Sequence, residues 1–200
     1  MKLKSILVLA ITVIAFTSQL AAQKINLTSG SIKEIIKEKN INIQYDYSDF
    51  QVGKAGSEAD YIAKKVAEYN KDEPGKGEKW QAGWVDARKN RYEPKFEELI
   101  NKMLEKNGIV HGNFADAKYT LIVKTTFVEP GFNVGVMKQP AYVSFEFTYV
   151  ETASPSTIVA KMTLLKVVGS QMMGYDFDMG SRIAESYAKA GKILGKYLAD

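Results

Sequence analysis

A group of carboxylates early in the chain has the residue types that hydrolysis requires. Asp46 and Asp49 flank a tyrosine, and Glu58 and Asp60 follow a little further on. Paired carboxylates act as acid and base on glycosidic bonds, and carboxylate oxygens also bind calcium. However, Asp46 and Asp49 end an alternating run and would face opposite sides of a continuing strand. The calcium-loop pattern is absent, so we interpret these residues as solvated carboxylates and helix caps.

Other reactive side chains are scarce. His111 is the single histidine, and the chain has no cysteine. One histidine cannot form a multi-histidine metal site, and a catalytic triad needs a placed nucleophile and acid as well. The lack of cysteine excludes disulfides and thiolate metal sites. Because His111 follows the helix stop at Asn107 and Gly108, we expect it in a loop before the sheet. No metal, cofactor or catalytic residue is predicted.

Two tryptophans four residues apart, Trp80 and Trp84, would lie on one face of a helix. They could form an aromatic platform for a sugar or peptide, but an apolar helix face docked on the domain is the commoner use of this spacing. Basic side chains nearby form either a solvated face or a surface for an acidic partner. These are Lys76, Lys79, Arg88, Lys89 and Arg91.

The segment 131–138 is unusually apolar for a connection between strands. Surface connections are normally polar, yet this one offers Phe132, Val134, Val136 and Met137 among glycines. It could fold back over the edge of the sheet, or the flanking strands could simply run further. Alternatively, it is a docking loop for another protein or for a second copy of the chain.

Residues 1–22 have the three parts of a secretory signal peptide. Lys2 and Lys4 form the charged start, 6–16 the apolar run, and 20–22 a small-residue cleavage site. The apolar run is too short to span a bilayer, although a buried N-terminal helix is the alternative. We therefore expect a periplasmic or secreted protein, with residues 23–200 as a single domain and no transmembrane segment. Cleavage of the signal peptide would remove Lys2 and Lys4, so the net charge would fall from +4 to +2 in the mature chain. Such a small charge does not indicate a nucleic-acid partner.

Alternating apolar residues predict a three-stranded antiparallel meander between positions 119 and 168. Each run has one apolar face and one polar face, as a half-buried sheet requires, and turn formers at 151–155 join the second run to the third. The apolar faces are Tyr119, Leu121, Val123 and Phe127; Val143, Phe145, Phe147 and Tyr149; and Ile158, Ala160, Met162 and Leu164.

The segments before and after the meander are mostly helical. A strand at 41–49 is followed by helices from 57, from 80 and from 94, with a polar loop at 71–79. Asp176 or Asp178 would cap a last helix, in which Gly191 and Gly195 indicate close packing on the sheet. The strand at 41–49 should reach the meander by a right-handed crossover. The predicted fold is α+β, a mixed sheet of about four strands covered on one face by helices.

Three segments, 45–48, 60–70 and 90–99, resemble a family of small secreted proteins from Bacteroidetes-type bacteria, a resemblance that implies no particular activity. They read Tyr-Asp-Tyr-Ser, Asp-Tyr-Ile-Ala-Lys-Lys-Val-Ala-Glu-Tyr-Asn and Asn-Arg-Tyr-Glu-Pro-Lys-Phe-Glu-Glu-Leu. The order of elements is also similar to small envelope domains, such as the N-terminal domain of the Tol-system propeller protein and the curli secretion-channel lipoprotein. Membrane anchoring does not carry over, because the lipoproteins' cysteine is missing. Such analogy says little about function.

Two functions are open at this stage. The first is a non-catalytic periplasmic binding or envelope-assembly module, which rests on export, on the envelope-like layout and on the apolar segment 131–138. Its partner would be an envelope protein or a second copy of the chain. The second is a small glycan-acting hydrolase that uses Asp46 or Asp49 with the two tryptophans. This alternative requires two carboxylates that converge in a cleft.

Overall fold

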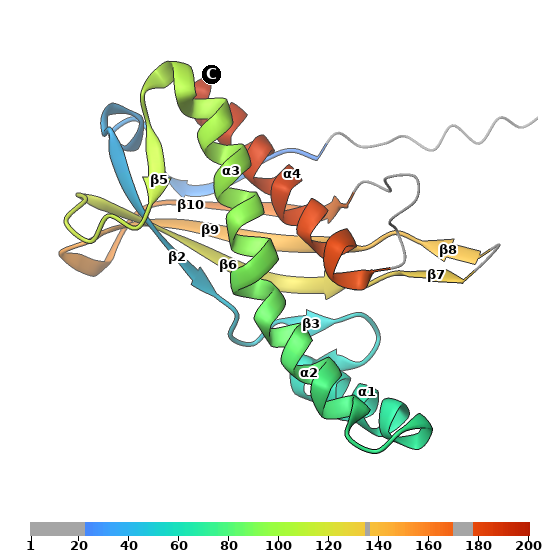
Figure 1. The fold of residues 1–200 in the computed structure, drawn as a ribbon. Coiled ribbons are helices and arrows are strands. Elements are labelled where there is room, and N and C mark those ends of the chain that lie inside the picture. Colours follow the sequence, from blue (N-terminus) through green and yellow to red (C-terminus); the bar gives the residue numbers. More distant parts are fainter. Residues whose placement is uncertain (1–22, 135–136, 170–177) are drawn as a thin grey trace, which may run out of the picture.

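A computed structural model describes residues 23–134, 137–169 and 178–200. The expected signal peptide and Val136 therefore lie outside the described residues. The fold is α+β, as expected, with two long helices lying across a large mixed sheet (Figure 1). The helices are α1 (Glu58–Asp72), α2 (Lys76–Ala87), α3 (Glu93–Leu104) and α4 (Met179–Ala199), with short helical turns at Ile35–Lys37, Arg88–Tyr92 and Glu105–Asn107.

Within the described residues the main sheet has eight strands, twice the predicted number. The order β1-β10-β9-β6-β2-β5 includes the expected meander β6-β9-β10 and the expected parallel pair β2-β6. The extra strands are short pieces of two to five residues at the edges of the sheet. The strands are β1 (Asn26–Gly30), β2 (Asn40–Asp46), β3 (Gln51–Val52), β4 (Gly56–Ser57), β5 (Val110–Gly112), β6 (Tyr119–Glu129), β9 (Tyr142–Glu151) and β10 (Ser154–Val168).

The core lies between the sheet and the helices α3 and α4. The predicted apolar face of β9 is fully buried. Along α4 the buried side chains include Ile183, Tyr187, Leu194 and Leu198. Gly191 and Gly195 do permit close packing, but against α3 rather than against the sheet. A Cβ at Gly191 would lie 2.3 Å from the carbonyl oxygen of Phe96, and one at Gly195 would lie 2.7 Å from Cβ of Met103. These glycines therefore bring the two helices together.

The predicted apolar faces of β6 and β10 were wrong in part, because each strand contains a β-bulge. The register of β6 against β9 shifts between Thr125 and Phe127, so Val128 takes the buried position that was expected for Phe127. The register of β10 shifts between Ile158 and Ala160, and the side chain of Ile158 is exposed. A bulge adds one residue to one strand and thereby reverses the facing of every residue beyond it.

Several predictions about the helical half were wrong in detail. The polar stretch 71–79 is not an extended loop, because α1 continues to Asp72 and α2 begins at Lys76. Helices α2 and α3 are joined without a break by a π-helical turn, Arg88–Tyr92. His111 is not in a loop but lies buried in β5, which pairs with β2. In the described part of the chain, no helix is long and apolar enough to span a membrane.

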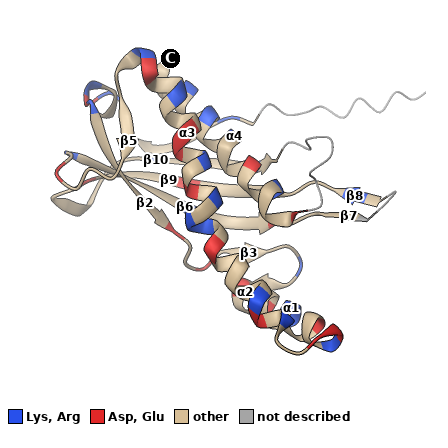
Figure 2. Cartoon of the chain, in the orientation of Figure 1, with Lys and Arg blue, Asp and Glu red and all other residues tan. Residues whose placement is uncertain are grey.

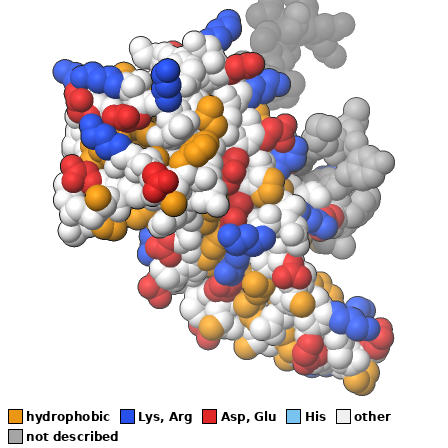
Figure 3. All heavy atoms as spheres, turned by 60° about the vertical axis from the view of Figure 1, so that its left-hand side comes forward, with side chains coloured by type: hydrophobic (Ala, Val, Ile, Leu, Met, Phe, Trp, Pro, Cys, Tyr) orange, Lys and Arg blue, Asp and Glu red, His pale blue; other side chains and the backbone are white. Residues whose placement is uncertain are grey.

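Two structures project from this body. Helices α1 and α2 form a helical hairpin at one end, and a two-stranded ribbon of β7 (Phe132–Val134) and β8 (Met137–Gln139) extends beyond the sheet (Figure 1). Charged residues of both signs are distributed over the helices α1 to α4 (Figure 2), whereas the described ribbon strands carry one charged residue, Lys138. In the face shown by Figure 3, hydrophobic, acidic and basic side chains are interspersed.

Candidate functional site

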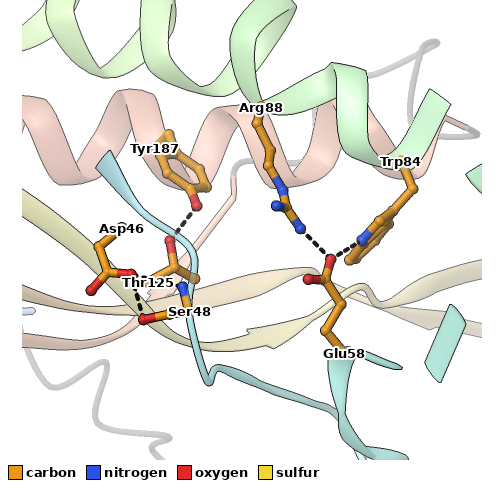
Figure 4. Close-up of polar contacts among 7 residues, drawn as sticks. All are labelled: Asp46, Ser48, Glu58, Trp84, Arg88, Thr125 and Tyr187. Carbon is orange, nitrogen blue, oxygen red and sulfur yellow. Dashed lines mark hydrogen bonds and ion pairs between the residues drawn. The ribbon is translucent and has the colours of Figure 1, made fainter. Parts of the chain in front are cut away.

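The carboxylate Asp46 is engaged in local contacts at the end of β2 (Figure 4). Its Oδ1 accepts hydrogen bonds from the backbone N–H of Ser48 at 2.7 Å and from the Ser48 hydroxyl at 2.6 Å. Its Oδ2 pairs with Nζ of Lys124 at 3.1 Å. Partial burial alone would raise the pKa of Asp46, but these donors outweigh it and lower the pKa. Asp46 is therefore an ionised group that holds the strand end. Asp49 is exposed in the turn that follows.

Glu58 and Asp60 are also held by neighbours, at a place separate from Asp46 (Figure 4). Glu58 accepts hydrogen bonds from the indole nitrogen of Trp84 and from the guanidinium of Arg88. Asp60 lies in the first turn of α1, where its backbone N–H donates to the hydroxyl of Ser57, the N-cap. The Asp60 carboxylate accepts a hydrogen bond from the Ser57 hydroxyl at 2.6 Å, so Asp46, Glu58 and Asp60 are each bound by neighbouring residues and Asp49 is exposed.

The two tryptophans lie in an aromatic cluster inside the helical hairpin. Trp80 and Trp84 stack at a centroid distance of 5.8 Å, with Tyr61 against both rings and Tyr69 against Trp80. Trp84 is only 6% exposed, whereas Trp80 is half-buried. The helices approach closely at Gly77, where a Cβ would lie 2.5 Å from a backbone oxygen of α1. An aromatic platform for a ligand would therefore depend on Trp80 alone.

His111 has a single hydrogen-bond partner for its ring. Its Nε2 lies 3.0 Å from the hydroxyl of Tyr149, and Nδ1 is buried without a partner. Burial lowers the pKa of His111 to about 3 and raises that of Tyr149, so both groups are neutral at pH 7. The two side chains thus form a buried hydrogen bond between β5 and β9.

Sequence reasoning did not identify a polar seam between β2 and α3. The hydroxyl of Tyr45 donates to Glu97 at 3.1 Å, and the hydroxyl of Tyr47 donates to Glu93 at 3.4 Å. Burial raises the pKa of Glu97, with a further contribution from the neighbouring charge of Glu93. The signal was visible in part, because Glu93 and Glu97 are four residues apart and share a helix face. Their tyrosine partners are Tyr45 in β2 and Tyr47 just after it, and no local pattern predicts that pairing.

The segment 131–138 is a β-ribbon, the continuation of the β6-β9 pair beyond a break at two prolines. Phe132 pairs with Gln139, Asn133 with Lys138 and Val134 with Met137. Residues that pair directly across two antiparallel strands share a face. Phe132 and Met137 therefore belong to one face of the ribbon, and Asn133 and Lys138 to the other. Of the alternatives raised by the sequence, the structure shows the one in which strand pairing continues beyond β6 and β9.

The base of the ribbon is tied to the body. Gly131 has a φ of +62°, a left-handed conformation, and a Cβ there would lie 2.3 Å from the carbonyl oxygen of Gln139. The guanidinium of Arg182, a buried residue in the first turn of α4, donates to the carbonyl oxygens of Pro130 and Gly131 at 3.3 Å each. The carboxylate of Glu129 accepts from the N–H of Gly131 at 3.2 Å. These contacts hold the ribbon where it leaves the sheet.

The apolar side chains of the ribbon are open to solvent. Phe132 is 42% exposed and Met137 is 62% exposed, among the most exposed large apolar residues in the described chain. An isolated two-stranded ribbon cannot bury either of its faces by itself. The ribbon therefore presents two exposed apolar side chains beyond a base that is tied to the body, and we take Phe132 and Met137 as the candidate functional site.

Comparisons with known proteins add little to this geometry. No family model and no curated protein matches the chain. Among solved structures, a PelC dodecamer from Paraburkholderia phytofirmans is 14% identical with a TM-score of 0.40, over 86% of this chain and 96% of that one. A Xanthomonas campestris protein described by the DUF330 family model is 12% identical with a TM-score of 0.33, over 52% and 59%. At such scores neither likeness carries an argument about function.

Proposed function

We propose that the protein is an exported, non-catalytic binding or envelope-assembly module that docks on another protein through the β7-β8 ribbon. The exposure of Phe132 and Met137 on a projecting ribbon is the observation that supports this proposal.

Export is supported by the signal-like pattern of residues 1–22. Cleavage after Ala22 would leave Gln23 as the first residue of the mature chain. The intact mass of the protein recovered from the periplasm or from the medium tests this directly. A recovered chain that still begins at Met1 would contradict export by this route.

No specific observation favours the hydrolase alternative. Asp46 and Glu58 are each bound by donors from their own surroundings. Among the described residues, no group of three or more metal-binding side chains is present that could assist catalysis. The assembly proposal requires only the ribbon.

The test compares the loss of exposed apolar side chains from the ribbon with the loss of one elsewhere. Phe132→Ser together with Met137→Ser removes the apolar face of the ribbon. Leu165→Ser, in β10, removes a side chain that is also 62% exposed but lies elsewhere. Each tagged protein is cross-linked in its native compartment, captured and examined by mass spectrometry. We expect the ribbon variant to lose a cross-linked species that the Leu165→Ser variant keeps.

A cross-linked species with twice the mass of the chain would identify a second copy, and another mass a different protein. Retention of the complex by the ribbon variant would contradict the proposal. Circular dichroism of both variants must show the same folded spectrum, so that loss of the complex is not loss of the fold.

A further inference from the structure

A groove between the outer sides of α3 and α4 is separate from the ribbon. It has a volume of about 450 Å³, within the range of small-ligand sites. Its described lining combines an apolar floor with a cationic rim. Leu99, Ala188 and Ile193 form the floor, Lys95, Lys189, Lys192 and Lys196 supply the ammonium groups, and Glu185 is the one carboxylate in the lining.

The excess of positive charge is local. An adjoining hollow along the same two helices, of about 250 Å³, is lined by Arg91, Lys95, Glu98 and Glu185 together with neutral residues. There Arg91 pairs with Asp178, and Lys95 pairs with Glu98 at 3.0 Å. Charge is therefore balanced at one end of the helix pair and unbalanced at the other.

The lysines of α4 are explained only in part by the helix itself, because Lys189 follows Glu185 by four residues, a favourable spacing, whereas Lys192 has no acidic residue three or four positions before it. Lys196 lies in the last turn, where a cation stabilises the helix end. Lys189 and Lys192 lie earlier, and like charges three and four residues apart repel each other. Within the described residues neither Lys192 nor Lys196 forms an ion pair, and Lys189 contacts only the carbonyl oxygen of Val168, at 3.5 Å. An anion in the groove would relieve this repulsion.

We propose that the groove binds a single-chain anionic amphiphile, an apolar chain that carries a phosphate or carboxylate head group. The chain would lie on Leu99 and Ile193, and the head group would contact Lys189 and Lys192. The combination of floor and rim favours this ligand class over a free anion, which would gain nothing from the floor, and over a neutral chain, which would gain nothing from the rim. This inference does not depend on the function of the ribbon.

The test is isothermal titration of the mature protein with dodecyl phosphate below its micelle concentration. Dodecanoate tests the carboxylate head, inorganic phosphate the head alone and dodecyl maltoside the chain with a neutral head. We expect saturable binding of one or both anionic amphiphiles, no binding of inorganic phosphate or of the maltoside, and weaker binding at high salt.

Two matched variants make the test specific. Lys189→Gln with Lys192→Gln should weaken binding roughly tenfold, because two charge-assisted contacts are lost. Lys64→Gln with Lys71→Gln changes the net charge equally on the exposed side of α1 and should leave binding unchanged. Equal binding by both double variants, equal binding of the maltoside, or no saturable binding of either anionic amphiphile would overturn the proposal.

Discussion

The two projections of the molecule treat their large apolar side chains in opposite ways. In the helical hairpin, Tyr61, Tyr69, Trp80 and Trp84 turn towards one another, and Trp84 is closed off by Glu58 and Arg88. In the ribbon, Phe132 and Met137 face solvent. Two packed helices bury their facing sides, whereas a two-stranded ribbon has no second layer. The comparison distinguishes a projection that packs its large apolar side chains against one another from one that leaves them exposed.

The largest expected effect lies in the helical hairpin. Trp84→Ala should lower the free energy of unfolding by about 3–5 kcal/mol, because it empties a buried site and leaves the Glu58–Arg88 pair without its indole donor. Urea unfolding measures the loss. The control is Val85→Ala, one residue away but 42% exposed, which should cost no more than about 0.5 kcal/mol. Equal costs would mean that the aromatic cluster does not hold the hairpin.

Lowering the pH should weaken the folded core without weakening binding through the ribbon. The pKa of His111 is about 3 in the folded chain, against an ordinary 6.5 when unfolded. Below pH 6.5 the unfolded chain gains a proton that the folded chain does not, so stability falls as the pH falls towards 3. At pH 5 the loss relative to pH 7 should be about 2 kcal/mol from this group. His111→Gln should flatten this dependence in urea unfolding at the two pH values.

Binding through the ribbon should not follow that pH profile while the protein stays folded. The ribbon strands β7 and β8 contain no acidic or histidine side chain. A complex that dissociates between pH 7 and pH 5 with unchanged circular dichroism would contradict docking by apolar contacts alone.

Adding a single methyl group at Gly131 should destabilise the base of the ribbon. Gly131→Ala places a Cβ on a left-handed residue, at a cost of about 1–2 kcal/mol before the contact with the Gln139 carbonyl is counted. Hydrogen exchange should show faster exchange at the base of the ribbon. Gly83→Ala, in the middle of α2 with open space around its Cβ, should instead stabilise the protein slightly. Unchanged exchange in Gly131→Ala would mean that the ribbon is not held there.

The ribbon face itself should contribute least to stability. Phe132→Ser with Met137→Ser should change the free energy of unfolding by no more than about 1 kcal/mol in total, because both side chains are classed as exposed. Urea unfolding beside Trp84→Ala makes the contrast explicit. A loss comparable to that of Trp84→Ala would show that the ribbon packs on its own chain.

Much of the fold could be predicted where one pattern continues without interruption. The alternation of β9 places each side chain of its apolar face as the structure has it. The bulge at Thr125–Phe127 could not be predicted, because Phe127 and Val128 are both apolar and either fits the buried face. The sequence predicts a polar loop over 71–79, but the left-handed conformation of Gly75 allows a tight turn there. Helices α1 and α2 therefore follow each other closely and form a hairpin.

The candidate site was predicted in its composition but not in its shape. The apolar residues of 131–138 were visible, whereas their pairing into a ribbon depends on the register of β6 with β9 and on the left-handed Gly131. The anchor Arg182 is about fifty residues away in the sequence, so no local pattern connects it to the ribbon.

The most direct test of the account places a photoactivatable aromatic residue at position 132 and, in a second protein, at position 85. Both positions are 42% exposed, one on the ribbon and one on the helical hairpin. After irradiation in the native compartment, we predict a discrete cross-linked species from position 132 and none from position 85. Cross-linking at neither position, or equally at both, would contradict the claim that the ribbon is the docking surface.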